Sequence, residues 1–246
     1  MNKSTIAVIP ARGGSKRIPR KNVRKLSGKP MIAWTIEAAL RSNIFDRILV
    51  STDDPEIAEV SRACGASVPF LRDAACDDYS PVSAATIYAL SQAEKVLGES
   101  YDVVVQLMPN CPLRTADDIL ASIAGFEEPG VNFQISFFEA PLVIPWWAAR
   151  LDSLRRPQLL FPQAATKRSQ DLETLFFPTG AVWIAKSKDL QEAGSFYGPD
   201  YRAFVLPWQA AVDIDTEADF QLAEALLRQE GSVPRQSVDA PGSARV

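Results

Sequence analysis

The stretch "IAVIPARGGSKRIPRKN" (residues 6–22) decides the fold and the chemistry expected of this chain. Its first four residues are apolar and predict a buried strand. Two adjacent glycines follow at positions 13 and 14, and residues 12–21 contain five Lys or Arg, with Arg12 counted as the first. A strand that runs directly into a glycine-containing basic turn is typical of a loop that holds a small anion.

Two glycines and two lysines make this turn a candidate phosphate loop. Gly13 and Gly14 can adopt positive φ and expose backbone N–H groups, and Lys16 and Lys21 add positive charge. The spacing matches neither the P-loop pattern nor the glycine pattern of dinucleotide-binding folds. A plain basic turn without a ligand is the alternative.

Positive charge is concentrated at the start of the chain. Residues 1–36 hold nine Lys or Arg and no acidic residue, whereas the rest holds 17 basic and 30 acidic residues. An acidic remainder disfavours binding of a nucleic acid along an extended surface, and the basic stretch lacks the interleaved aromatic residues of a single-strand platform. The pattern therefore predicts a local anion site and no nucleic-acid partner.

Composition limits the class of protein and the available chemistry. The 246 residues are 47% hydrophobic and 23% charged, which suits a globular α/β protein. A signal-like apolar segment and a long apolar run are both missing, so a cytoplasmic protein without a membrane partner is expected. Three separated cysteines and no histidine argue against a disulfide framework and a Cys/His zinc site. Histidine is also excluded as general base.

Apolar strand patterns alternate with amphipathic helix patterns. Strands are expected at 6–9, 47–51, 102–107, 133–138 and 181–185, and helices at 30–40, 54–64, 82–97, 115–126 and 216–230. This alternation predicts an α/β fold with a mainly parallel twisted sheet and helices on both faces. Ligands of such sheets bind beyond the carboxyl ends of the strands, where the basic turn lies.

Two segments depart from this alternation. Residues 139–178 contain five prolines and the adjacent Trp146 and Trp147, and we expect them to protrude as an excursion from a domain that spans 1–230. Residues 231–246 are rich in Gly, Ser and Pro and are expected to form a disordered tail.

A pair of carboxylates near the end of the chain is a candidate metal site. Asp213 and Asp215 flank Ile214, so in an extended chain both side chains face one way. Two hard oxygen ligands beside a phosphate site suit Mg²⁺. The alternative is a capping pair before the last helix, and Asp215 could serve in both ways.

Several motifs together resemble one known family. "IPARGGSKRIPRKN", "GKPMIAWTIEAAL", "ILVSTDD", "PLR", "TKRSQDL" and "DIDTEADF" occur in the order found in the acylneuraminate cytidylyltransferases, which activate nine-carbon, sialic-acid-type sugars. The resemblance covers roughly residues 5–228. It implies a Rossmann-like nucleotidyltransferase fold. It also implies a reaction in which CTP and a nonulosonic acid give a CMP-sugar and pyrophosphate, with Mg²⁺ as cofactor.

The resemblance also implies roles for individual residues. Arg12, Lys21, Asp213 and Asp215 would be catalytic, and the two aspartates would bind the metal. Lys21 would stabilise charge at the α-phosphate. The substrate-binding residues would be Gly13, Gly14, Ser15 and Lys16 at the triphosphate, Asn22 near the ribose, Arg72 and Ser83 at the cytidine, and Gln106, Arg168 and Gln170 toward the sugar. A surface position for Arg168 and a structural salt bridge for Arg72 are the alternatives.

The sugar end departs from the family pattern. Met108 stands where a glutamine is usual, Thr179 opens "TGA" in place of "NGA", and no lysine precedes Trp146. The nucleotide end is intact. These changes leave the substrate undecided among N-acetylneuraminic, legionaminic, pseudaminic and related acids. The loss of polar groups favours a less polar, doubly acylated substrate.

The resemblance further implies a homodimer in which the excursion closes the pocket of the neighbouring subunit. Trp146, Trp147 and Phe161 are the candidate contacts, and packing within the excursion is the alternative. Two other functions are kept open. One is activation of the eight-carbon Kdo acid, and the other is a non-catalytic nucleotide-binding protein on the same scaffold.

Overall fold

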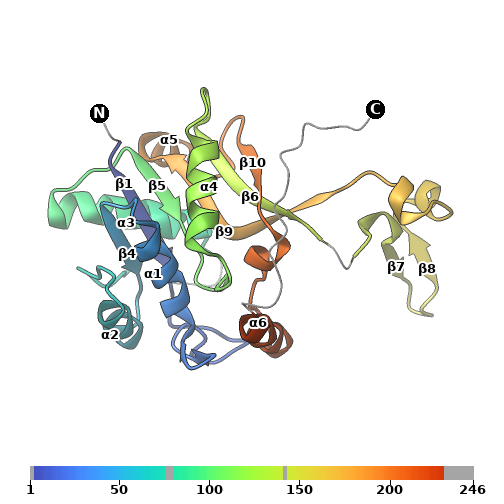
Figure 1. Ribbon diagram of the computed structural model, residues 1–246, viewed down its shortest axis with the longest axis horizontal. Helices are drawn as coiled ribbons and strands as arrows, with labels where there is room; N and C mark the ends of the chain where they lie inside the picture. The colour runs from blue at the N-terminus through green and yellow to red at the C-terminus, as the bar shows by residue number, and fades with distance from the viewer. Residues whose placement is uncertain (1–2, 76–79, 141–142, 230–246) are drawn as a thin grey trace.

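The computed structural model describes residues 3–75, 80–140 and 143–229. The expected tail at 231–246 lies outside these residues. Figure 1 shows a rounded body built around one sheet and an arm that extends from one side of it. In the described ranges, no helix combines the length and the apolar character needed to span a membrane.

A six-stranded sheet forms the centre of the body. In spatial order the strands are β10 (Arg202–Val205), β6 (Phe133–Glu139), β9 (Phe176–Lys186), β5 (Val103–Gln106), β1 (Thr5–Pro10) and β4 (Arg47–Ser51). β1 pairs in parallel with β4 and β5, and β6 pairs in parallel with β10. The predicted mainly parallel sheet is confirmed.

Strand β9 is the exception, because it pairs antiparallel with both β5 and β6. It returns from the excursion directly onto β6, as in a long hairpin, with no helical crossover to reverse its direction. It also begins at Phe176, earlier than the strand expected at 181–185.

Helices cover both faces of the sheet. Three of them pack on the face of Ala7 and Ile9, namely α1 (Met31–Ser42), α2 (Pro55–Ala63) and α4 (Ala116–Phe126). On the opposite face, Ile6 and Val8 pack against α3 (Val82–Leu97) and α5 (Ser187–Ala193). Alternate residues of β1 thus enter different cores, which explains why the strand is apolar throughout.

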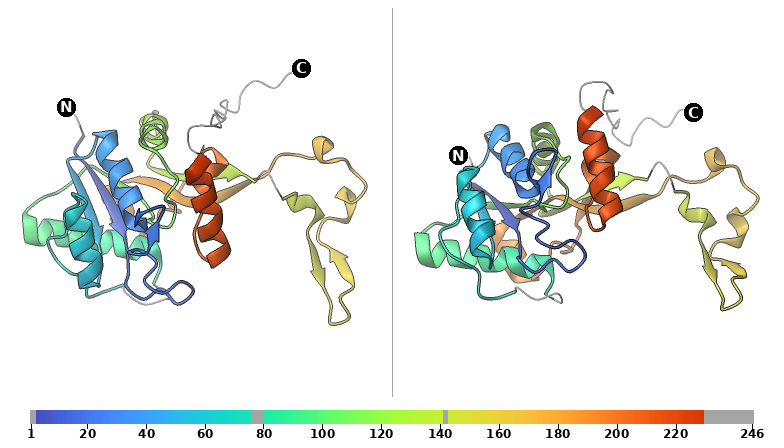
Figure 2. Two further views of the ribbon diagram at one scale, coloured as in Figure 1. Left: turned by 60° about the horizontal axis from the view of Figure 1, so that its bottom comes forward. Right: turned by 90° about the horizontal axis from the view of Figure 1, so that it is seen from below.

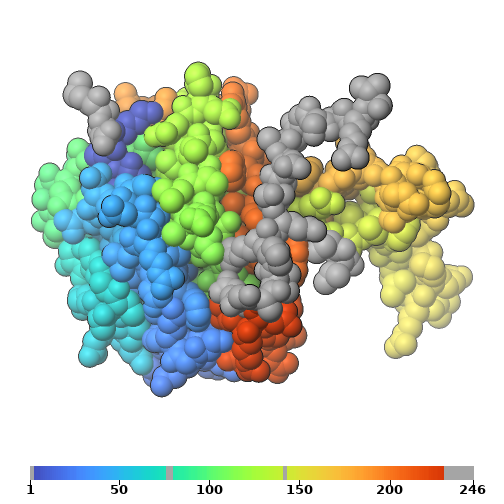
Figure 3. Space-filling view, in the orientation of Figure 1, coloured from blue at the N-terminus to red at the C-terminus, as the bar shows by residue number. Residues whose placement is uncertain are grey.

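The last helix, α6 (Glu217–Gln229), closes the body beside the basic loop. Phe220 and Ala223 of this helix share a small apolar cluster with Ile18, Leu26 and Ile214. Figure 3 shows the result, with the blue N-terminal loop and red α6 in contact at the lower edge of the body. The loop that follows β1 and the last helix therefore build this side of the molecule.

Local capping explains where the expected helices begin. The Asp54 carboxylate accepts hydrogen bonds from the backbone N–H groups of Glu56 (2.8 Å) and Ile57 (3.1 Å), as predicted for the start of α2. Thr115 and Asp118 form a reciprocal capping box at α4. Pro30, expected in the first turn of α1, is instead its N-cap.

Short elements were not predicted. These are the hairpin of β2 (Lys25–Leu26) and β3 (Lys29–Pro30), helix α5 and edge strand β10. Each is too short to show a helical or strand period in the sequence.

The excursion forms the arm in Figures 1 and 2. It carries a small antiparallel pair, β7 (Ala149–Leu151) and β8 (Pro157–Leu159), and three single-turn 3-10 helices at Pro145–Trp147, Pro162–Ala164 and Ser169–Asp171. Among its described residues, only Ala164 is buried. This arm therefore has almost no hydrophobic core within one chain.

The capping box gives a stability prediction. Thr115→Ala removes the side-chain oxygen that accepts the Asp118 N–H, and we expect a loss of about 1 kcal/mol in unfolding free energy. Urea denaturation followed by circular dichroism measures it. Thr166→Ala, at an exposed position of the arm, is the control and should change stability by less than about 0.5 kcal/mol. Equal losses in both variants would contradict the capping role.

Candidate active site

Two adjoining compartments open beyond the carboxyl ends of β1 and β5. The larger, of about 430 Å³, is called the basic compartment, and its lining includes Arg12, Ser15, Lys16, Arg17, Lys21, Asn22, Asn110 and Asp215. The smaller, of about 220 Å³, is called the side compartment, and its lining includes Arg72, Ala75, Ser80, Val82 and Ala85. Both share Pro10, Arg12 and Met108, so they form one cleft. Its position is the one expected for a ligand of a parallel sheet.

Ion pairs join the basic loop to the carboxylate segment. Lys21 Nζ donates to the backbone oxygen of Ile214 (2.7 Å) and to Asp215 Oδ1 (3.1 Å), although Asp215 lies 194 positions away in sequence. Arg17 contacts the other oxygen of the same carboxylate at 2.7 Å. The predicted Lys21 and Asp215 are therefore brought together on the wall of the basic compartment.

The glycines serve a different purpose from the one predicted. Neither Gly13 nor Gly14 has positive φ. Gly13 is needed instead for close approach, because a Cβ there would lie 2.6 Å from Asp54 Oδ2. The Gly13 N–H also donates to Asp53 Oδ1 at 2.9 Å, so in this structure a carboxylate occupies the donor expected to meet phosphate. Gly14 is exposed on the loop.

Asn22 ties the end of the basic loop back to its beginning. Its side chain is buried, and Nδ2 donates to the backbone oxygen of Arg12 at 3.0 Å. A buried side-chain amide that closes a loop fixes the backbone on both sides of it. Arg12, Ser15 and Lys16 are thereby presented along the compartment that they line.

Asp213 lies beside the cleft, in contact with the lining residue Asn110, and part of its surface meets solvent. Loss of hydration, together with the nearby negative charge of Asp215, raises its pKa to about 6. Asn110 Nδ2 donates a hydrogen bond to Asp213 Oδ1. Asp213 and Asp215, which the sequence predicted to face one way, are thus close enough for their negative charges to repel each other.

The donor set of this pair suits Mg²⁺. Within the described residues, no group of three or more His, Cys, Asp or Glu side chains could hold a metal ion. Mg²⁺ does not need such a cage, since it is commonly held by one or two carboxylates together with substrate phosphates. The repulsion that raises the pKa of Asp213 is also what a bound cation would relieve.

Arg72 lines the side compartment and is 4% exposed. Its Nη1 contacts Ser51 Oγ at 3.5 Å, and its backbone N–H donates to the Thr52 oxygen at 2.7 Å. Strand β4 therefore anchors this residue at the wall of the cleft.

Gly13, Gly14 and Asp213 adjoin lining residues of the cleft without lining it themselves, and four other predicted site residues are not part of it. Gln106 is fully buried, and its Oε1 accepts a hydrogen bond from the hydroxyl of Thr86 at 2.7 Å. Ser83 is also buried, and its Oγ accepts from the backbone N–H of Phe196 at 3.4 Å. Gln106 thus faces α3, whereas Ser83 of α3 faces the segment of Phe196, because strand and helix periodicity turns both side chains inward.

The other two, Arg168 and Gln170, are exposed on the arm. Arg168 pairs with Asp171 at 2.8 and 3.0 Å. The arm holds both residues away from the body that contains the cleft, as Figures 1 and 2 show. Within one chain they do not join the other predicted site residues.

Sequence reasoning gave no role to Arg114, which donates to the backbone of Met108, a residue that lines both compartments of the cleft. This arginine is 2% exposed, and its Nη1 donates to the backbone oxygens of Ala181 (2.6 Å) and Met108 (3.3 Å). Burial lowers its pKa to about 10. The "PLR" motif was a signal for this residue, but the sequence does not show which carbonyl groups a buried guanidinium will meet.

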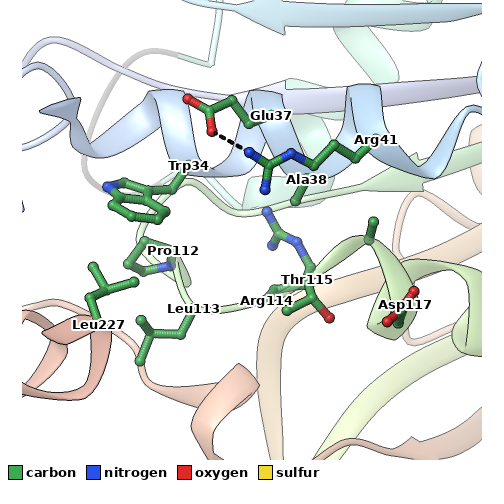
Figure 4. Close-up of a pocket in the computed structure, with 11 residues that line it drawn as sticks. Trp34, Glu37, Ala38, Arg41, Pro112, Leu113, Arg114, Thr115, Asp117 and Leu227 are labelled. Carbon is green, nitrogen blue, oxygen red and sulfur yellow. Dashed lines mark hydrogen bonds and ion pairs between the residues drawn. The ribbon is translucent and has the colours of Figure 1, made fainter. Parts of the chain in front are cut away.

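A separate pocket of about 260 Å³ lies between α1, α4 and the loop of Pro112 and Leu113 (Figure 4). Its walls carry charges of both signs, and Glu37 pairs with Arg41 at 3.4 Å. Such balanced charge does not favour a triphosphate, whereas the basic compartment does.

A basic loop at the ends of parallel strands, facing two carboxylates, defines an α/β enzyme that acts on a nucleoside phosphate. A family model described as "Cytidylyltransferase" matches residues 6–138. The chain is 36% identical to a pseudaminic acid cytidylyltransferase of Campylobacter jejuni, covering 91% of this chain and 96% of that protein. It is also 36% identical to a CMP-N,N'-diacetyllegionaminic acid synthase of Legionella pneumophila, over 93% of this chain and 99% of that protein. The chain belongs to the cytidylyltransferase family.

A solved structure supports the fold independently. A CMP:2-keto-3-deoxy-manno-octonic acid synthetase complexed with CTP superposes with a TM-score of 0.67 at 18% identity, covering 92% of this chain and 99% of that one. At this identity the likeness concerns the fold alone.

The raised pKa of Asp213 gives a test by pH. Its folded pKa, about 6, exceeds the ordinary value of 3.8, so the ionised carboxylate destabilises the fold above pH 6 and this cost disappears below the unfolded pKa. Asp213→Asn should therefore raise the unfolding free energy near neutral pH by on the order of 1 kcal/mol, a value reduced for partial solvent screening. The gain should vanish toward about pH 4.

Thermal unfolding in metal-free buffer at several pH values measures this gain. Glu59→Gln, at an exposed position of α2, controls for removal of one negative charge. A gain that is independent of pH, or equal in both variants, would contradict the assigned pKa.

Proposed function

We propose that this protein transfers CMP from CTP to a nonulosonic acid and releases pyrophosphate. The observation that carries the proposal is the two-compartment cleft, in which the basic loop faces Asp213 and Asp215. The basic compartment offers positive charge for a triphosphate. The side compartment has the size and the mainly apolar wall that suit a nucleotide base. The similar proteins of Campylobacter and Legionella are named for the same type of reaction.

The basic loop would supply binding and charge stabilisation. Arg12, Ser15 and Lys16 line the compartment and would hold the triphosphate, with Asn22 close to the ribose and Arg72 at the cytidine. Gly13 and Gly14 would contribute backbone donors once the nucleotide displaces Asp53. The anomeric hydroxyl of the sugar would attack the α-phosphorus as pyrophosphate leaves. Positioning and electrostatics provide most of the acceleration in such transfers.

Lys21 is suited to the α-phosphate because it is held in place before the substrate arrives. Its ammonium group is fixed by Ile214 and Asp215, and only 15% of its side chain is exposed. A cation preorganised in a partly dehydrated site stabilises developing negative charge more strongly than one on a mobile surface chain.

We assign a Mg²⁺ ion to Asp213 and Asp215. The ion would neutralise the negative charge that develops on pyrophosphate. The support is the chemistry of the donors, two facing carboxylates at the edge of a triphosphate-sized compartment.

The wall around Met108 favours a substrate with little polar surface. Met108 lines both compartments and lies so close to Gly180 that a Cβ there would approach Met108 Cγ to 2.8 Å. A thioether offers no hydrogen-bond donor and only a weak acceptor. We therefore propose a doubly acylated nonulosonic acid, of the kind after which the similar Legionella protein is named.

A homodimer would explain the arm. Four of its leucines, Leu151, Leu154, Leu159 and Leu160, are between 42% and 71% exposed. Trp146 packs edge-on against Phe161 with ring centroids 5.1 Å apart, so these two rings shape the arm from within. Exposed apolar side chains on a projection without a core are typical of a surface that a partner covers. The arm would then carry Arg168 and Gln170 to the cleft of the neighbouring subunit.

The activity is tested by pyrophosphate release from CTP and Mg²⁺ with N-acetylneuraminic, legionaminic, pseudaminic and Kdo acids. We expect turnover with a doubly acylated nine-carbon acid and its loss on chelation of the metal. Asp215→Asn should lower kcat by about 100-fold or more, since it removes one of the two charged ligands. Glu59→Gln should be fully active.

Folded protein that binds CTP yet releases no pyrophosphate with any acid would favour a non-catalytic nucleotide-binding role, and turnover with Kdo alone would favour the eight-carbon substrate.

The dimer is tested by light scattering at micromolar concentration. We expect twice the chain mass of 26.9 kDa. Leu154→Asp places a charge on the exposed apolar surface of the arm and should shift the mass toward the monomer. Leu222→Asp, at an exposed position of α6 on the body, is the matched control. A wild-type protein with the mass of one chain would contradict the proposal.

A further inference from the structure

Asn110 contacts the carboxylate segment through both its backbone and its side chain. It lies in the loop between β5 and α4 and lines the basic compartment. Its backbone oxygen accepts a hydrogen bond from the Ile214 N–H at 2.8 Å, and its Nδ2 donates to Asp213 Oδ1. The loop that follows β5 therefore holds both the backbone and the first carboxylate of this segment.

The chemistry of the two groups fixes how they meet. An ionised carboxylate only accepts hydrogen bonds, so the amide must present its N–H to Asp213 and keep its oxygen, Oδ1, on the other side. Asp213 Oδ1 is thereby occupied. Both oxygens of Asp215 are also engaged, by Lys21 and Arg17.

One carboxylate oxygen of the pair is left over. Among the described residues, Asp213 Oδ2 has no hydrogen-bond or ion-pair partner. A hard, negatively charged oxygen with no protein partner, in a cleft that suits a nucleoside triphosphate, is an available ligand for a divalent cation.

The amide oxygen of Asn110 supplies a second, independent observation. It is buried and lacks a hydrogen-bond donor in the part of the chain that the structure describes. Leaving such an oxygen without a donor is unfavourable, so a ligand that supplies one is favoured. A hydrated cation or a substrate brings water or hydroxyl donors into the same compartment, because Mg²⁺ commonly retains several of its waters.

We propose that Asn110 is a positioning residue for the divalent cation. Its N–H fixes the orientation of the Asp213 carboxylate and leaves Oδ2 for the ion, while its own oxygen accepts a hydrogen bond from a water or hydroxyl group of the bound ligands. The inference rests on the proposed function, because it takes the cation site at Asp213 as given. It adds a residue that acts on the cation through Asp213.

The test compares Mn²⁺ binding, followed by electron paramagnetic resonance at one saturating CTP concentration, in wild type and variants. Asn110→Ala should weaken Mn²⁺ binding by about 10-fold, the usual minimum for loss of a residue that orients a metal ligand. The Mg²⁺ concentration for half-maximal pyrophosphate release should rise by a similar factor, with CTP affinity unchanged within about twofold. Asn110→Ser keeps a donor and should restore part of the affinity.

Two controls separate positioning from a structural role. Asn132→Ala, at an exposed position at the opposite end of the sheet, should leave Mn²⁺ binding unchanged. In an Asp213→Ala background, Asn110→Ala should cause a smaller further loss of Mn²⁺ affinity than it does in wild type, because the orienting part of its effect acts through that carboxylate.

Different results would overturn the positioning role of Asn110 and the proposed cytidylyltransferase function. Unchanged Mn²⁺ affinity in Asn110→Ala, or an equal further loss in the Asp213→Ala background, overturns the role of Asn110 while wild-type turnover stands. A lower melting temperature with unchanged metal dependence also overturns it. Wild-type protein that binds no Mn²⁺ and releases no pyrophosphate overturns the cation site and the proposed function together.

Discussion

The contact of Lys21 with Ile214 and Asp215 is the constraint on which the site depends. It joins the loop that follows the first strand to the segment that precedes the last helix. Neither side could hold this geometry alone, since a basic loop repels itself and the negative charge of Asp215 helps to raise the pKa of Asp213. The apolar cluster of Ile18, Ile214 and Phe220 lies beside this contact and holds the two segments together without adding charge. Charge complementarity and packing thus act on the same two pieces of chain.

The sequence anticipated those features that depend on local patterns. Ile6 to Ile9 predicted the central strand, Asp54 and Thr115 predicted the helix starts, and the two aspartates predicted facing carboxylates. Features that depend on contacts between distant segments were not predictable in the same way. The burial of Gln106 follows from its pairing with Thr86, and the reversed direction of β9 follows from where the arm re-enters the sheet. The glycines show the limit most clearly, because Gly13 is required by the approach of Asp54 and not by its own dihedral angles.

The arm presents a different physical problem from the body. A projection whose described residues include one buried side chain cannot recover, within one chain, the conformational entropy lost on ordering it. Its aromatic pair and its two tryptophan N–H bonds to backbone oxygens give it shape, but they bury little surface. Residues such as Arg168 are therefore interpretable only together with whatever covers the arm, whereas the basic loop and the carboxylate segment meet within one chain.

The hydrogen bond from the Gly13 N–H to Asp53 has a consequence for which anions the cleft admits. The carboxylate is attached to the same molecule, so it competes for that donor at an effective concentration in the millimolar range or above. A free phosphate or sulfate ion, which can make only a few contacts, must win this competition with each of them. A nucleotide whose base also occupied the side compartment would offset the cost of displacing Asp53 with many more contacts. The basic loop thus carries its own competitor for anions, and this competitor disfavours small anions relative to the nucleoside triphosphate proposed as substrate.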